Sequence, residues 1–140
     1  MAKNIKEKST SMTCAAYGPT VLRVFTGVLF VVPGLMKLMN PSMIIGMLGQ
    51  MGWPLATVFG WIVILSEVLC GLAVIAGFKL KYTVWPLVVI MLVAVFTVYV
   101  PMLGSDPLAA MGQVLFHLLA LAALVNLYLT GPGALAVDKK

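Results

Sequence analysis

Four long apolar segments dominate this 140-residue sequence and restrict the folds that it can adopt. They cover about residues 19–38, 55–77, 83–100 and 110–129, and we expect the third to end at Pro101. A helix needs about 20 mostly apolar residues to cross the hydrocarbon core of a bilayer. Backbone polar groups in lipid must pair within their own segment, which favours helices over strands. The predicted fold class is therefore an all-α transmembrane four-helix bundle.

The composition excludes a water-soluble domain. Hydrophobic residues make up 62% of the chain and charged residues only 9%, whereas soluble domains carry about 25% charged residues. The net charge of +5 comes from basic residues that sit mostly at segment ends and form no basic face. Nucleic acid is therefore not an expected partner, and the lipid bilayer is.

The chain has room for one domain. We divide it into a cytoplasmic N-terminal segment (1–18), a four-helix transmembrane domain (19–130) and a cytoplasmic C-terminal tail (131–140). Residues 42–52 are too short to span, so we expect a short interfacial helix between the first and second spans. Pro19 suits the first turn of a helix, where its missing N–H would have no partner.

The lysines predict the orientation. Four spans place both chain ends and the connection between spans two and three on one side, and most lysines lie there. The positive-inside rule then puts both termini in the cytoplasm. We expect a multi-pass protein of the cytoplasmic (inner) membrane of a prokaryote. The opposite side carries Lys37 and Asp106, and the lysines on the cytoplasmic side are Lys3, Lys6, Lys8, Lys79, Lys81, Lys139 and Lys140.

Ionisable residues within spans are candidates for function, because insertion of each costs about 2.5–3.5 kcal/mol. The first span carries such residues on a stripe with spacings of four, three, four and three residues. Its glycines let another backbone approach or leave space for a ligand. The stripe consists of Arg23, Gly27, Phe30, Gly34 and Lys37.

The second span repeats this spacing around Glu67, which lies about 15 Å from either end by helical rise. Arg23 is its predicted partner, because two unpaired charges in lipid cost more than one pair. Two interpretations of the pair remain open: it fixes helix register, or it lines a cavity and relays a proton. The glycines that flank Glu67 on its stripe are Gly60 and Gly71.

The fourth span places Gln113 and His117 on one stripe. A histidine can exchange protons near neutral pH, and Lys37 and Glu67 are available on other spans. One interpretation is a polar cavity lined by Lys37, Glu67 and His117 in the outer half of the bundle, with 42–52 as a lid. The other is that Lys37 reaches the outer surface and His117 bonds a backbone carbonyl. The third span is assigned to packing and lipid contact.

No metal site or bound redox cofactor is expected from the sequence. Cys14 and Cys70 form no CxxC pair, and His117 cannot build a metal cluster alone. No flavin, haem or iron–sulfur motif is visible, which favours an accessory subunit over a complete oxidoreductase. Whether the chain is an enzyme stays open.

Three motifs resemble those of the DoxX family of small four-helix membrane proteins, over about residues 19–138. The first is Leu22-Arg23-x3-Gly27-x2-Phe30-x3-Gly34-x2-Lys37, and the second is Glu67-x3-Gly71-x5-Gly77-Phe78. The third is the C-terminal Gly131-Pro132-Gly133-x-Leu135. The resemblance implies quinone-linked redox chemistry, often on sulfur compounds, beside partner subunits. At the motif positions, Arg23, Lys37 and Glu67 are the polar residues of interest.

The favoured function is a membrane subunit of a quinone-linked redox system, with a polar cavity between spans one, two and four. Lys37 and His117 would hold oxygens of a quinone or anion, and Glu67 would pass protons while Arg23 holds its charge. One alternative is a non-catalytic scaffold, or accessory subunit of a larger membrane complex, that binds another membrane protein through its glycine faces. The partners left open are membrane or redox subunits and a second copy of the chain. Another is a small-molecule carrier, since a fold does not fix a function.

Overall fold

The computed structural model describes the backbone of residues 2–138 and the side chains of residues 17–138. Four of its helical stretches are long and apolar enough to cross a membrane: Tyr17–Met39, Ala56–Ala76, Leu80–Met102 and Pro107–Thr130. The prediction of an all-α bundle with four spans and a short helix is confirmed, and the described residues contain no strand. The elements are α1 (Ala2–Met39), α2 (Pro41–Gln50), α3 (Ala56–Ala76), α4 (Leu80–Ala94), η1 (Val95–Tyr99), α5 (Val100–Met102) and α6 (Pro107–Thr130).

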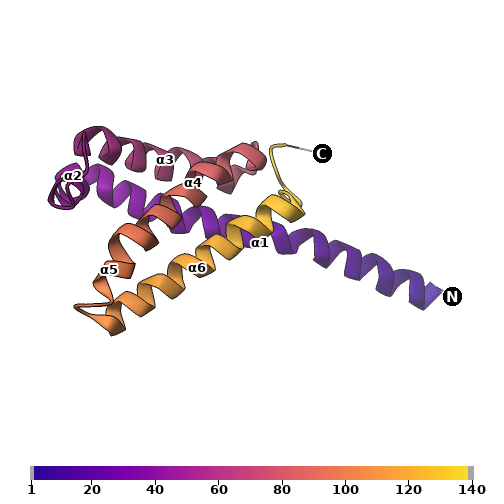
Figure 1. The fold of residues 1–140 in the computed structure, drawn as a ribbon. Coiled ribbons are helices and arrows are strands. Elements are labelled where there is room, and N and C mark those ends of the chain that lie inside the picture. Colours follow the sequence, from indigo (N-terminus) through magenta and orange to yellow (C-terminus); the bar gives the residue numbers. More distant parts are fainter. Residues whose placement is uncertain (1, 139–140) are drawn as a thin grey trace.

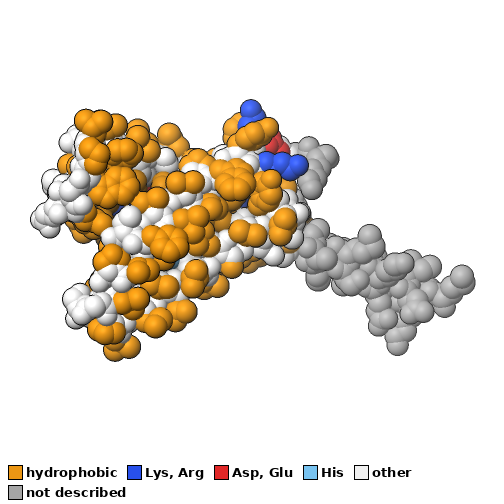
Figure 2. All heavy atoms as spheres, in the orientation of Figure 1, with side chains coloured by type: hydrophobic (Ala, Val, Ile, Leu, Met, Phe, Trp, Pro, Cys, Tyr) orange, Lys and Arg blue, Asp and Glu red, His pale blue; other side chains and the backbone are white. Residues whose placement is uncertain are grey.

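The spans form a closed ring in which α1 packs on α3, α3 on α4, α4 on α6, and α6 on α1. The short helix α2 packs against α3 and α1. Figure 1 shows both chain ends on one side of the bundle and α2 and α5 at the opposite end. Toward that opposite end α1 and α3 separate from α5 and α6, and the space-filling view keeps a notch between the two groups (Figure 2).

The first helix begins earlier than the sequence indicated. Its predicted start at Pro19 is wrong: the helical backbone runs from Ala2 through Pro19 and Pro33 to Met39. A proline inside a helix removes one backbone hydrogen bond, but it does not by itself force the helix to end. The expected N-terminal segment (1–18) is thus helical from Ala2, while the side chains of its lysines lie outside the described residues, as do Lys139 and Lys140.

The third span also differs from its prediction, because it does not end at Pro101. Pro101 has no N–H, and the preceding turn widens into the π-helix η1, in which the Val100 N–H donates to the Val95 carbonyl. The Thr97 hydroxyl donates to the Val93 carbonyl at 2.7 Å. The span then continues to Met102. This wide turn positions Tyr99, the last residue of η1, against α6.

Two apolar clusters hold the bundle together. A small one joins α2 to the first half of α3 through Ile44, Leu48 and Ile64. The larger cluster, called the main core below, lies nearer the end with the chain termini. It consists of Phe30, Val74, Leu80, Val84, Leu87, Met91, Ala120, Leu124 and Leu127.

The flank of α4 and α6 that faces the viewer in Figure 2 is mostly hydrophobic, as expected of a surface in contact with lipid.

The glycines on the α1 and α3 stripes lie against each other. A Cβ at Gly27 would be 2.8 Å from the Gly71 carbonyl oxygen, and one at Gly34 would be 3.0 Å from the Glu67 Cβ. A Cβ at Gly60 would be 2.7 Å from the Ile45 side chain on α2. These small residues allow close approach within the chain. The glycine faces are therefore used inside the bundle, which weakens the idea that they receive another protein.

Candidate functional site

Four polar side chains, one from each span, occupy comparable positions next to the main core. Lys37 follows Phe30 on α1, Glu67 precedes Val74 on α3, Tyr99 follows Met91 along the third span, and His117 precedes Ala120 on α6. Each lies about one to two helical turns from the main core, on the side of α2 and α5. We call Lys37, Glu67, Tyr99 and His117 the polar layer.

An ion pair joins the first two members of this layer. The Lys37 Nζ lies 2.6 Å from Glu67 Oε1 and 2.7 Å from Glu67 Oε2, so the ammonium donates to both carboxylate oxygens. The Glu67 side chain is 3% exposed and that of Lys37 is 29% exposed. An ammonium has three N–H donors, so one remains for a ligand. Lys37 therefore points to Glu67 and does not extend to the outer surface, and the pair has one partly open side.

The prediction that Arg23 pairs with Glu67 is wrong. Both residues are 2% exposed, but the Arg23 guanidinium donates to the carbonyls of Pro132 at 2.8 Å and Leu135 at 3.1 Å. Arg23 lies fourteen residues before Lys37 on α1 (37 − 23), about 21 Å along the helix axis. Because α1 and α3 are antiparallel, Glu67 comes opposite the Lys37 end of α1 and not the Arg23 end.

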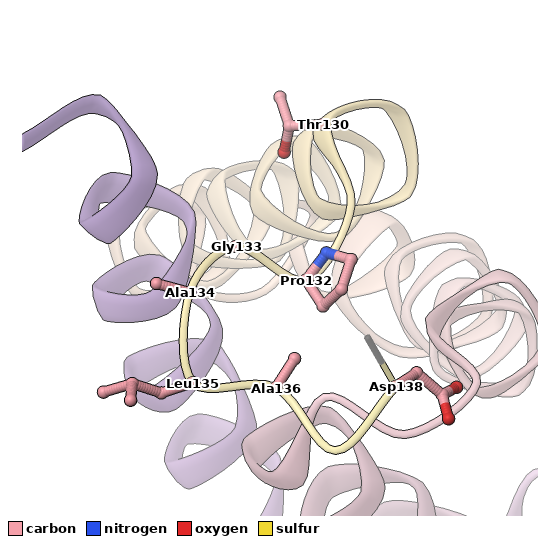
Figure 3. Close-up of a pocket in the computed structure, with 7 residues that line it drawn as sticks. All are labelled: Thr130, Pro132, Gly133, Ala134, Leu135, Ala136 and Asp138. Carbon is pink, nitrogen blue, oxygen red and sulfur yellow. The ribbon is translucent and has the colours of Figure 1, made fainter. Parts of the chain in front are cut away.

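Arg23 instead fastens residues 131–138, the C-terminal segment, across one end of the bundle. Thr20 Oγ1 donates to the Ala134 carbonyl, and the N–H of Val137 donates to the Ala76 carbonyl at 3.0 Å. The Asp138 carboxylate accepts the Lys79 N–H at 2.6 Å. Figure 3 shows this segment curving from α6 past α1 toward α3 and α4. It ties the ends of all four spans together.

A shallow hollow of about 440 Å³ lies within this curve (Figure 3). Its lining comes from the end of α6 and the C-terminal segment and is mostly small or apolar: Thr130, Pro132, Gly133, Ala134, Leu135, Ala136 and Asp138. The polar layer is not part of it. The hollow therefore belongs to the C-terminal segment and the end of α6, and not to the predicted cavity.

His117 is fixed by its own helix and by two aromatic rings. Its Nδ1 lies 2.7 Å from the Gln113 carbonyl oxygen, one turn earlier on α6. The Tyr99 ring lies 4.6 Å from the imidazole centroid and the Phe116 ring 5.6 Å from it. The residue is 6% exposed. These contacts agree with the interpretation in which His117 bonds a backbone carbonyl, and they leave its second nitrogen available.

The site residues expected from sequence thus separate into two places. Lys37, Glu67 and His117 belong to the polar layer, whereas Arg23 binds the C-terminal segment. Gln113 contributes its backbone carbonyl, and its side chain is exposed. Tyr99 was missed, because its span was assigned to packing. A tyrosine two residues before a proline in an apolar span is the signal that could have pointed to it.

Comparison with known proteins identifies one family. The model of the DoxX family matches residues 18–100. These residues include α1 from Gly18 onward, α2, α3, α4 and η1, and with them Lys37, Glu67 and Tyr99. The match ends before α6 and the C-terminal segment. No curated protein and no solved structure matches the chain.

Proposed function

Because this chain belongs to the DoxX family, we propose that it is a membrane subunit of a quinone-linked redox system and that the polar layer binds the quinone head group. The observation that carries the proposal is the Lys37–Glu67 ion pair within the spans. Ionisable groups in a bilayer are costly, and where they occur they commonly mark ligand sites or proton relays. A pair needed only for register could be replaced by apolar residues at little cost.

In this proposal each polar side chain has a separate task. The third N–H of Lys37 donates to one oxygen of the head group, and His117 contacts another. Glu67, which pairs with Lys37 and not with Arg23, exchanges protons with the ligand. The conversion of quinone to quinol consumes two protons and two electrons, so such exchange is part of the chemistry. The two electrons that reduce the quinone come from a partner subunit that oxidises a small reduced substrate, with sulfur compounds as candidates.

We further propose that both termini face the cytoplasm. The C-terminal segment and the α3–α4 turn with Lys79 are joined by a hydrogen bond, so they lie at the same end of the bundle. Figure 2 shows the visible basic side chains at this end. Under the positive-inside rule this end is cytoplasmic. The polar layer, Asp106 and α2 then lie toward the outer face of a prokaryotic inner membrane.

The test is quinone binding to the protein in lipid nanodiscs. A short-tailed quinone is titrated in its oxidised and reduced states against the parent chain, Lys37→Met and Glu67→Gln, with Lys81→Met as the matched control. We expect the parent and Lys81→Met to bind alike, and the Lys37 and Glu67 variants to lose at least about tenfold in affinity, or 1.4 kcal/mol. If the parent bound neither the oxidised nor the reduced state, the proposal would be rejected and the scaffold alternative favoured.

A further inference from the structure

The hydrogen bond of His117 determines which of its ring nitrogens carries the proton. The Gln113 carbonyl oxygen can only accept, so the group 2.7 Å from it must be a donor. A C–H contact to oxygen is longer, at about 3.3–3.6 Å. The atom is therefore Nδ1, and it carries a hydrogen. In the neutral ring, Nε2 then has a lone pair and can only accept a hydrogen bond.

The surroundings favour this neutral form. An imidazolium would add a second cation to a layer that already holds Lys37, and the Glu67 carboxylate is bound through both oxygens to that lysine. Asp106, the N-cap residue of α6, lies eleven residues before His117, about 16 Å along the helix axis. No carboxylate among the described residues pairs with His117, and an unpaired charge in a span is costly.

Nε2 is available to a ligand. It has no hydrogen-bond partner in the part of the chain that the structure describes. Among those residues, the fully buried side-chain nitrogen without a partner is Arg23 Nε, so His117 Nε2 retains some exposed surface. The Tyr99 ring, at 4.6 Å, restricts rotation of the imidazole. Nε2 is thus a hydrogen-bond acceptor in a fixed place.

From this arrangement we infer that the polar layer selects the reduced, hydroxyl-bearing quinol over the oxidised quinone, with a quinol O–H donating to His117 Nε2. The inference rests on the proposed function and specifies its ligand. A quinone offers only carbonyl oxygens, which would face the lone pair of Nε2 and leave it unsatisfied. Sites built to bond a hydroxyl discriminate strongly against analogues that lack it. Lys37 donates to either form, because both have oxygens that accept, so it does not discriminate.

The first measurement reads the tautomer without any ligand. The chain contains one histidine, so ¹⁵N-histidine labelling of the full chain, with any affinity tag removed, gives one pair of ring nitrogen signals. We expect Nδ1 to show the shift of a protonated nitrogen and Nε2 that of an unprotonated one. Protonation of Nε2 alone, or of both nitrogens, would overturn the inference.

The second measurement compares the two redox states of one short-tailed quinone in nanodiscs. We expect the quinol to bind at least about tenfold more tightly. His117→Phe retains an aromatic ring but has no acceptor, so quinol affinity should fall to that of the quinone. Asn126→Ala, an exposed polar position on the same helix, should preserve the preference.

The outcomes separate the two proposals. Equal affinity of the parent for quinol and quinone overturns the inference and leaves the quinone-linked function standing. A preference that survives in His117→Phe also overturns it, because the discrimination then comes from elsewhere. Binding of neither form, with the expected tautomer present, overturns the proposed function and the inference with it.

Discussion

The two residues of the ion pair should differ in what their loss costs. Lys37→Met leaves the Glu67 carboxyl, 3% exposed, without its donor. Even after taking up a proton, that carboxyl is a buried polar group with nothing to bond. Removal of one partner of a buried pair typically costs about 3–5 kcal/mol, and we expect about 3 kcal/mol here. Glu67→Gln leaves a lysine that is 29% exposed, whose flexible stem can carry the ammonium to polar surroundings. We expect a loss of about 1 kcal/mol.

The double variant tests whether these costs arise from the pair. Once Lys37 is methionine, replacing Glu67 with glutamine leaves only an unpartnered amide, at about 1–2 kcal/mol. The double variant should therefore be more stable than Lys37→Met alone, with a coupling energy of about 2 kcal/mol. Lys81→Met, at an exposed position, should change stability by less than about 0.5 kcal/mol.

The assay is equilibrium unfolding of the purified protein in mixed detergent, followed by the fluorescence of its three tryptophans. Two results would refute the reasoning. One is a larger loss for Glu67→Gln than for Lys37→Met, which would mean that burial does not set the cost. The other is simple additivity in the double variant, which would mean that the two side chains do not depend on each other.

Three further outcomes are expected. Gly27→Ala should lose about 1–3 kcal/mol of stability in the same unfolding assay, because the added Cβ would overlap α3. A Cβ at Gly112 would meet no atom within 4 Å, so Gly112→Ala should not lose stability. Equal losses in the two variants would contradict the packing described. Arg23→Gln should free the C-terminal segment, so that a cysteine probe there, in a cysteine-free background, reacts about tenfold faster; an unchanged rate would show that Arg23 does not hold it. An impermeant thiol reagent added outside intact cells should label a cysteine at Asp106 and not one at Lys81, and equal labelling would reject the proposed orientation.

The spans and their polar residues could be predicted from the sequence alone. Helical backbone bonds are local, and lipid leaves few alternatives, so apolar length was enough to find four spans and the short helix α2. Lys37, Glu67 and His117 stood out because charge and polarity in an apolar run are visible without coordinates. The ends of the helices were less predictable. Pro19 and Pro101 were expected to mark boundaries; Pro19 instead lies inside a helix that begins at Ala2, and the third span ends at Met102, one residue after Pro101.

The partners of these residues depended on tertiary structure. The identity of the cation opposite Glu67 follows from the offset between antiparallel α1 and α3, which the close approach of Gly27 and Gly71 determines. Spacing along α1 places Arg23 and Lys37 on the same stripe. It does not determine which of the two lies opposite Glu67 on α3. Arg23 is bound by carbonyls more than a hundred residues away, and Tyr99 reaches His117 through a widened turn. Such contacts depend on how the helices pack, because a side chain is buried by contact with other segments and the sequence of its own helix does not specify them.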